Sequence, residues 1–373
     1  MNALAPFAVP VIARHGAGAP VLPYPDHLAA AWELAHVPRS PGAPTVVSLF
    51  AGGGGSSLGY AVAGYREPLA VEWDPYAAHC LRVNLPGVEV FEGDVADLSV
   101  DACLDRIGMA PGELDVLDGS PPCQGFSTGG KRRLDDPRNA LFREYVRLLR
   151  GLMPRVLVME NVAGLVRGKM RLVFRDVLHE LTASGYVVSA RLLNAMWFGV
   201  PQSRARLIVV GVRQDLVETH GVAPSHPAAQ GWPIPVREAL RGVEQEAVPE
   251  LSPKYRRLAP LVRPGQCAAD VDHGKGFQNL VRLDYAKPSP TISRLNPGFG
   301  RGTPLHPVRH RSLSVPEARR LCGFPDAYVL PDAPFPTRWG VLGNAVPPPF
   351  MAAVASHIRA ELFDRMGTED GTQ

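Results

Sequence analysis

The chain has 373 residues, of which 46% are hydrophobic and 20% are charged, and its formal net charge is +3. This length suggests two domains, or one large domain with an insertion. The apolar fraction is normal for a folded protein and too high for a disordered one. No stretch approaches the roughly 18 uninterrupted apolar residues that a membrane-spanning helix requires, so we expect no membrane partner.

The start of the sequence and the cysteines indicate a cellular compartment. The first residues lack the basic stretch and apolar core of a secretory signal. The five cysteines are scattered and odd in number, and none forms a Cys-x-x-Cys pair. This pattern argues against a disulfide framework or a zinc site and favours a reducing cytosol. We therefore expect a cytoplasmic protein without a metal ion.

Residues 1–43 come first in chain order and are rich in Ala and Pro. Their one helical candidate spans 26–36, where Asp26 is placed to cap the helix. We interpret 1–43 as an N-terminal appendage to the domain that follows.

From residue 45 onward, apolar runs of strand length alternate with amphipathic stretches of helix length. Strands that are apolar throughout and separated by helices indicate a mostly parallel sheet with helices on both faces. We therefore predict an α/β domain over 44–212, with its ligands at the carboxyl ends of the strands. The strands are predicted at 45–50, 68–72, 88–91, 114–118 and 155–160, and the helices between them at 56–64, 75–84 and 139–152.

The segment 213–311 is rich in loops and prolines. Within it, residues 251–311 hold 11 Lys and Arg against 3 Asp and Glu, a local excess of positive charge larger than that of the whole chain. A basic segment apart from an α/β core suits contact with a phosphate backbone, and a solvated basic face is the alternative. The last segment, 312–373, is predicted to carry helices from 315–321 and near 350–363.

A glycine-rich loop, Phe-Ala-Gly-Gly-Gly-Gly-Ser at 50–56, follows the first strand and opens a helix. Its glycines let the backbone approach a ligand, and the helix N-terminus favours an anionic group. Glu72 ends the second strand, where a carboxylate can accept hydrogen bonds from a ribose diol. Trp73 offers a flat face to an adenine, and Asp94 is placed to accept from the adenine amino group. Together these residues predict a nucleoside-containing cofactor, and the lack of Gly-x-Gly-x-x-Gly spacing disfavours a dinucleotide.

The segment Ser120-Pro121-Pro122-Cys123-Gln124 follows the fourth strand. Two prolines fix the backbone there, and the carboxyl end of a strand is a poor position for a buried core cysteine. We therefore predict a reactive thiol, since the thiolate is the nucleophilic form of cysteine. Residues 129–133, Gly-Gly-Lys-Arg-Arg, are interpreted as a mobile loop that closes over a polyanion, with a solvated loop as the alternative.

Two further groups complete the pattern. Glu160-Asn161-Val162 ends the fifth strand, which places a carboxylate at the same edge of the sheet. Gln202-Ser203-Arg204-Ala205-Arg206 leads into a strand at 207–211. If this stretch is extended, its alternate residues Gln202, Arg204 and Arg206 share one face, and two arginines there could grip a phosphate or a base oxygen. An Arg-x-Arg pair on an edge strand without such a role is the alternative.

In this order the segments resemble the bacterial-type DNA (cytosine-5) methyltransferases, over about 45–363. The resemblance implies a Rossmann-like, S-adenosylmethionine-dependent methyltransferase domain with a smaller, loop-rich target-recognition domain at 213–311, and 312–373 returning to the catalytic domain. One departure from the family pattern is Pro316, which stands where the ninth family block has an arginine. That block organises the recognition region in the family, so the departure bears on how this region docks and not on the chemistry. The matching blocks are Phe50-Ala51-Gly52-x-Gly54-Gly55, Pro121-Pro122-Cys123-Gln124, Glu160-Asn161-Val162, Gln202-x-Arg204-x-Arg206 and Gly343-Asn344-Ala345-Val346-Pro347.

The resemblance implies a covalent mechanism on a cytosine that is flipped out of the duplex. Cys123 would attack C6 and make C5 nucleophilic. Glu160 would contact N3 and the exocyclic amine, with its carboxyl protonated or sharing a proton with N3. Arg206, with Arg204, would hold the cytosine carbonyl and a flanking phosphate, and residues 125–133 would close behind the base.

The expected binding residues fall into two groups. Those for S-adenosyl-L-methionine are Phe50, Gly52, Gly54, Glu72, Trp73, Asp94, Pro121 and Asn344. Those for DNA are Gln124, Ser127, Lys131, Arg132, Gln202 and Thr291, where Thr291-Ile292 resembles a pair near base contacts in the family.

Two alternatives remain beside a DNA methyltransferase. A related tRNA cytosine-5 methyltransferase would share the core chemistry, but such enzymes carry a Cys-Phe-Thr motif that this sequence lacks. A catalytically silent DNA-binding regulator on the same fold is disfavoured by the nucleophile, carboxylate and arginines. We expect a cytoplasmic, nucleoid-associated monomer that acts on double-stranded DNA, with a restriction endonuclease as a genetic companion.

Overall fold

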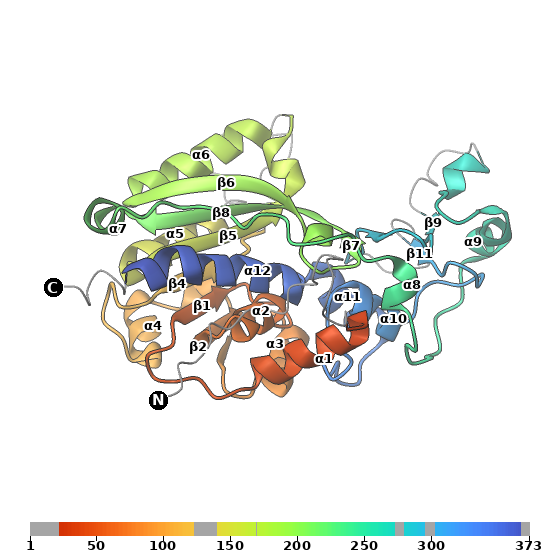
Figure 1. Ribbon diagram of the computed structural model, residues 1–373, viewed down its shortest axis with the longest axis horizontal. Coiled ribbons are helices and arrows are strands. Elements are labelled where there is room, and N and C mark those ends of the chain that lie inside the picture. The colour runs from red at the N-terminus through yellow and green to blue at the C-terminus, as the bar shows by residue number, and fades with distance from the viewer. Residues whose placement is uncertain (1–21, 123–139, 169, 273–279, 295–302, 367–373) are drawn as a thin grey trace. The chain divides into compact units, whose positions relative to one another are not determined.

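The computed structural model describes residues 22–122, 140–168, 170–272, 280–294 and 303–366. They form two compact units, each assembled from segments that lie far apart in the sequence (Figure 1). In this grouping, residues 312–350 and the start of the chain belong with 229–311. The sheet unit comprises Ala35–Leu193, Ala205–Ala228 and Met351–Gln373, and the loop unit comprises Met1–Leu34, Asn194–Arg204 and Ala229–Phe350.

The sheet unit contains a seven-stranded sheet in the order β3-β2-β1-β4-β5-β8-β6 (Figure 1). Neighbouring strands from β3 to β5 pair in parallel, whereas β8 is antiparallel to β5. The five predicted strands are β1 to β5, and the mixed, mostly parallel sheet is confirmed. The strands are β1 (Thr45–Leu49), β2 (Arg66–Glu72), β3 (Glu89–Glu92), β4 (Val116–Gly119), β5 (Val156–Val162), β6 (Tyr186–Asn194) and β8 (Ala205–Arg213).

Helices cover both faces of this sheet, which explains why β1 and β4 are buried along their whole length. On one face a Cβ at Gly119 would lie 2.8 Å from the ring of Tyr145, so α5 packs closely there. On the other face Tyr60 of α2 donates a hydrogen bond to Asp118. The helices of this unit are α2 (Gly55–Val62), α3 (Pro75–Asn84), α4 (Val100–Ile107), α5 (Ala140–Leu152), α6 (Met170–Ala183), α7 (Gln214–His220) and most of α12 (Pro348–Ile358).

The first helix begins earlier than predicted. Helix α1 spans Tyr24–Ala35, and the amide of Asp26 already donates to the carbonyl of Pro23. Asp26 therefore lies in the first turn and does not cap the helix, so that prediction is wrong. The buried Tyr24 hydroxyl donates to the carbonyl of Arg320, which fixes the start of the helix within the loop unit.

The loop unit has little regular structure and depends on side-chain hydrogen bonds instead. The clearest case is Arg282 on β9, which is 3% exposed and donates to the carbonyl oxygens of Ala259, Val262, His306 and Arg309. One buried guanidinium thus joins three segments. The strands are β7 (Gln202–Ser203) paired with β10 (Ser289–Pro290) and β9 (Leu280–Arg282) paired with β11 (Thr303–Leu305), and the helices are α8 (Val236–Ala239), α9 (Pro253–Leu258), α10 (Val315–Leu321) and α11 (Phe335–Asn344).

Helix α10 explains how Pro316 is tolerated. Ser314 caps the helix by accepting from the amide of Glu317, whose carboxylate accepts from the amide of Ser314 in return. Pro316 lies in the first turn, where a missing N–H breaks no helical hydrogen bond. None of the helices within the described ranges is long and apolar enough to cross a membrane.

Candidate active site

The glycine-rich loop turns sharply between β1 and α2. Phe50, Gly52 and Gly54 all have left-handed backbone conformations, with φ of 58°, 57° and 83°. For a non-glycine residue such as Phe50 this conformation costs about 1 kcal/mol or more, so the surrounding structure must impose it. A Cβ at Gly52 would meet no atom within 4 Å, which means that the backbone faces open space there. The loop is otherwise largely buried, so it offers open space beside the backbone of Gly52, close to a helix N-terminus that favours an anionic ligand group.

Glu72 is fixed at the end of β2 by two backbone amides. One carboxylate oxygen accepts from the amide of Gly52 at 2.7 Å and the other from the amide of Asp74 at 2.9 Å. Burial raises the pKa of Glu72, and these hydrogen bonds act against that effect. Each oxygen has a second lone pair, so the carboxylate can still accept from a ribose diol.

Trp73 follows directly and is 75% exposed. Asp74 caps α3 by accepting from the amides of Tyr76 and Ala77, and this cap fixes the backbone beside the indole. A large apolar ring held in solvent by a rigid segment is suited to stacking on a flat ligand. Glu72 and Trp73 together fit the ribose and adenine of a nucleoside.

Asp94 lies at the same edge of the sheet. Asp94 is the second residue after β3. The amide of the preceding Gly93 donates to the carbonyl of Glu72, which places Asp94 beside the end of β2. Its carboxylate is exposed and accepts from the amide of Ala96 at 2.9 Å. This placement leaves acceptor capacity at the sheet edge where the adenine amino group is expected.

Several predicted residues lie outside the described residues. They are Cys123, Gln124, Ser127, Lys131 and Arg132, together with the rest of the predicted closing loop. The description of this segment ends at Pro121, which is buried, and Pro122, which is exposed.

Asn161 connects that segment to β5. Its side-chain amide donates to the carbonyl oxygen of Pro121 at 3.1 Å, and its own carbonyl oxygen accepts from the amide of Val162. Glu160 immediately precedes Asn161 in the chain. The backbone that leads into Cys123 is therefore held beside the strand end that carries the predicted catalytic carboxylate.

Glu160 and Arg206 form an ion pair between β5 and β8. The distance from Glu160 Oε1 to Arg206 Nε is 2.6 Å, and the two side chains are only 10% and 13% exposed. In the antiparallel register Val162 lies opposite Arg206, which places the guanidinium beside the end of β5. The structure thus brings these two predicted catalytic residues together.

The other two residues of the Gln-x-Arg-x-Arg block are buried and hydrogen-bonded to backbone groups of the loop unit. Gln202 is completely buried, and its amide donates to the carbonyl of Leu321 and accepts from the amide of Ile292. Arg204 is 2% exposed and donates to the carbonyl oxygens of Ile292 and Gly343. The predicted shared face holds for Gln202 and Arg204, since Arg204 Nη1 lies 3.5 Å from Gln202 Oε1. It does not extend to Arg206 as one continuous strand, because the chain leaves β7 after Ser203 and enters a different sheet at Ala205.

Thr291 and Asn344 are both exposed residues of the loop unit. Thr291 donates to the carbonyl of Ser203, and Asn344 ends α11. The preceding Gly343 is required by packing, since a Cβ there would overlap the backbone of Ser293 and lie 2.5 Å from the amide nitrogen of Arg294. The family blocks around Gln202, Thr291 and Gly343 therefore form one packed cluster.

Two acidic residues were not recognised from the sequence. Glu67 on β2 and Asp118 on β4 are 8% and 2% exposed, and burial raises their pKa values to about 7 and about 8. The available signal was a carboxylate inside an apolar strand, as in Val116-Leu117-Asp118-Gly119.

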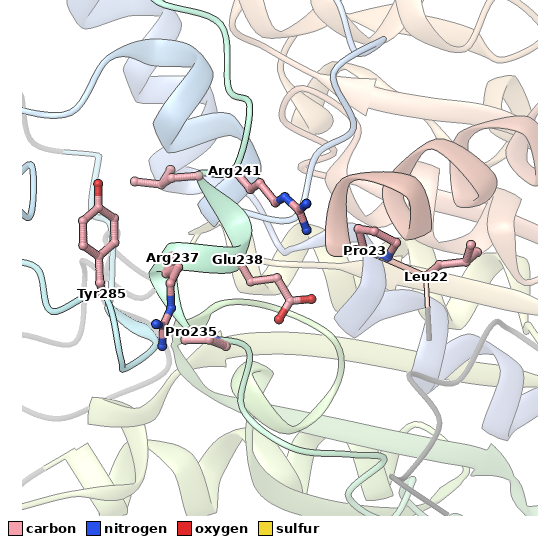
Figure 2. A pocket seen from close by; sticks show the side chains of 8 residues that line it. Leu22, Pro23, Pro235, Arg237, Glu238, Arg241 and Tyr285 are labelled. Carbon is pink, nitrogen blue, oxygen red and sulfur yellow. The ribbon is translucent and has the colours of Figure 1, made fainter. Parts of the chain in front are cut away.

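The loop unit also contains an open cavity of about 800 Å³ (Figure 2). It lies between α8, Tyr285 and the segment that precedes α1, and none of the predicted site residues lines it. Its lining residues are Leu22, Pro23, Pro235, Arg237, Glu238, Leu240, Arg241 and Tyr285.

Comparison with known proteins decides the family. The sequence profile described as C-5 cytosine-specific DNA methylase matches residues 44–360. The chain belongs to this family. Members use S-adenosylmethionine, and the glycine loop, Glu72 and Trp73 fit that cofactor in this methylase.

Relatives cover most of the methylase. Type II methyltransferase M.XorII of Xanthomonas oryzae is 31% identical, with 86% of this chain and 85% of the relative covered. Type II methyltransferase M1.HphI of Haemophilus parahaemolyticus is 33% identical, with 84% and 86% covered. A prophage-encoded protein of Escherichia coli, whose crystal structure is described as that of a DNA modification methyltransferase, has the same fold, with a TM-score of 0.67 at 23% identity over 86% of this chain and all of that one.

Proposed function

We propose that this protein is a DNA (cytosine-5) methyltransferase that methylates C5 of a flipped-out cytosine in a specific duplex sequence, through a covalent bond between Cys123 and C6. The observation that carries the proposal is the hydrogen bond from Asn161 to the carbonyl of Pro121. It joins the strand end that bears Glu160 to the segment that leads into the nucleophile.

The chemistry requires a nucleophile for C6, a proton shared with N3 and a hydrogen-bond donor that positions the cytosine. The Cys123 thiolate forms the S–C6 bond, and the electron pairs of the ring move toward C5 and N3. Glu160 shares a proton with N3 and so stabilises the charge that develops there. Arg206, already beside Glu160, donates to the cytosine carbonyl. S-adenosylmethionine, when bound, supplies the methyl group for C5.

Completion of the reaction restores the aromatic ring. A base removes the C5 proton, and its electron pair reforms the C5–C6 double bond as the Cys123 sulfur leaves. Arg204 acts indirectly in this scheme, because its donors hold the Ile292 and Gly343 segments rather than the base.

A duplex DNA substrate is supported by the family, described as C-5 cytosine-specific DNA methylase, and by relatives that are named type II methyltransferases. We extend to this chain the methylation of a short duplex sequence that a companion restriction endonuclease would otherwise cut. Residues 251–311 carry 11 Lys and Arg against 3 Asp and Glu, and apart from the buried Arg282 this basic segment is suited to the DNA backbone.

Bisulfite sequencing of DNA from a methylation-free bacterial host that expresses the protein tests the proposal. Methylated cytosines should fall within one short sequence, and an oligonucleotide with 5-fluorocytosine at that position should form a covalent adduct with the wild type. Cys123→Ser should form no adduct, whereas Cys267→Ser, which changes another cysteine, should react like the wild type. Methyl transfer to tRNA alone would favour the tRNA alternative, and duplex binding without transfer would favour a silent regulator.

A further inference from the structure

The guanidinium of Arg147 on α5 donates hydrogen bonds to the turn that follows β3. Its Nη2 donates to the carbonyl oxygen of Val95 at 3.1 Å and to that of Leu98 at 2.8 Å. Its Nε donates to the carboxylate of Glu144, one turn earlier on the same helix, at 2.6 Å. The group is thus held at three points, and a carboxylate of its own helix compensates its charge.

The turn 94–98 begins with Asp94, the residue expected beside the amino group of the adenine. The Asp94 carboxylate accepts from the amide of Ala96 and so caps the turn. Val95 and Leu98 are 3% and 1% exposed, so their side chains are packed in the core while Asp94 stays exposed. The segment contains only one turn of 3-10 helix, and so short a helix is not stable by itself. Contacts from other elements must therefore fix it.

Two neighbouring elements hold this segment in place. On one side, the amide of Gly93 donates to the carbonyl oxygen of Glu72 at the end of β2. On the other side, Arg147 reaches from α5 to two carbonyl oxygens of the turn 94–98. Glu72 is the residue that fits the ribose, so the first contact ties the turn to the ribose site. The placement of Asp94 relative to that site therefore depends on the second contact, through Arg147.

We propose that Arg147 is a positioning residue for the cofactor, because its guanidinium holds the turn that presents the Asp94 carboxylate to the amino group of the adenine. This inference rests on the proposed function and adds a residue to its cofactor pocket. Arg147 acts only through Asp94. Without the guanidinium, the carbonyl oxygens of Val95 and Leu98 lose a charged donor, and the free-energy cost of such a loss favours a shifted turn.

The attachment of α5 to the sheet does not depend on Arg147. Tyr145 on the same helix is completely buried, and its hydroxyl donates to the carbonyl oxygens of Leu117 on β4 and Val158 on β5. The side chain of Arg147, in contrast, is 34% exposed. Replacement of Arg147 should therefore disturb the turn 94–98 and leave the helix in place.

Discrimination between two ligands tests the inference. They are S-adenosylhomocysteine, the product left by the cofactor, and its purine analogue, in which hydrogen replaces the adenine amino group and nothing can donate to Asp94. In calorimetric titrations the wild type should bind S-adenosylhomocysteine about 10-fold to 100-fold more tightly than the analogue. In Arg147→Met this ratio should fall to about threefold or less, with the affinity for the analogue unchanged.

Arg150→Met is the matched control for the loss of an arginine from α5. Arg150 lies one turn after Arg147, and its guanidinium donates to Glu180 and Ser184, away from the turn 94–98. This variant should keep the wild-type ratio. Arg147→Lys provides a second test variant, because one ammonium replaces a planar group that bonds Glu144 and both carbonyls at once. Its ratio should lie between those of the wild type and Arg147→Met.

A double-mutant cycle separates positioning of Asp94 from a general loss of structure. Asp94→Ala should lower the ratio by itself, and Arg147→Met added to it should lower the ratio no further. Equal weakening of both ligands in Arg147→Met, or a wild-type ratio in both Arg147 variants, would overturn the inference and leave the proposed function intact. A wild type that binds the two ligands equally would do the same. A wild type that neither binds S-adenosylhomocysteine nor transfers methyl groups to DNA would overturn the proposed function and the inference with it.

Discussion

Nε of Arg206 lies 2.6 Å from Oε1 of Glu160. The two residues belong to antiparallel strands whose register places both side chains at the carboxyl end of β5. The pair is nearly excluded from water, so each charge interacts strongly with the other and with any group that enters beside them. A base bound there would meet a carboxyl group and a guanidinium donor at fixed positions.

Arg206→Ala should lower the rate of methyl transfer about 100-fold, because it removes a preorganised donor from a water-excluded site. The change also leaves Glu160 without its counter-ion. Arg213→Ala is the control, since Arg213 ends the same strand and pairs with the exposed Asp215. We expect single-turnover rates within about twofold of the wild type for the control, and a comparable loss in both variants would contradict the assignment.

Glu72→Ala should weaken S-adenosylmethionine binding by about 10-fold to 100-fold, the range expected for loss of hydrogen bonds to a charged group. The substitution also frees the amides of Gly52 and Asp74, which loosens the glycine loop. Calorimetric titration without DNA measures the affinity. Glu92→Ala, at the exposed end of β3, should bind normally, and unchanged affinity in Glu72→Ala would exclude Glu72 from the cofactor site.

Gly343→Ala should destabilise the protein by at least about 2 kcal/mol, because the new methyl group overlaps backbone atoms of Ser293 that cannot move independently. Gly340→Ala lies one turn earlier in α11 and its Cβ meets nothing within 4 Å. This control should be neutral or stabilise the helix by up to about 1 kcal/mol. Urea unfolding measures the free energy of unfolding of both variants. Equal values would show that the backbone at Ser293 moves to accommodate the new methyl group.

The stability of the protein should fall as the pH rises from about 5 to about 8. The pKa values of Glu67 and Asp118, about 7 and about 8, lie above those of ordinary carboxyls, so the folded state holds protons that the unfolded chain releases. Their stabilising contribution is complete below the unfolded pKa values and is lost as the pH passes through the folded ones. Urea unfolding at several pH values should give a flatter dependence for Glu67→Gln and Asp118→Asn than for the wild type, and parallel curves would refute this account.

The sequence alone determined where the first five strands lie along the chain. It also identified most of the polar residues at the carboxyl edge of the sheet. Fully apolar runs at β1 and β4 indicated strands buried on both faces, and the structure has helices on both. Glu72, Trp73, Asp94 and Glu160 were identified because parallel strands direct their carboxyl ends to one edge. These inferences need only local pattern and chain order.

Tertiary structure alone decided how the arginines and the buried acids are used. Alternation along a strand predicts side-chain direction only while the strand continues, and the chain changes sheets at Arg204, so Arg204 binds carbonyls while Arg206 pairs with Glu160. The burial of Asp118 beside Ser48 of β1 and Val158 of β5 depends on the register between strands that are distant in the sequence. Register is fixed by packing between elements, and no local pattern of residues encodes it.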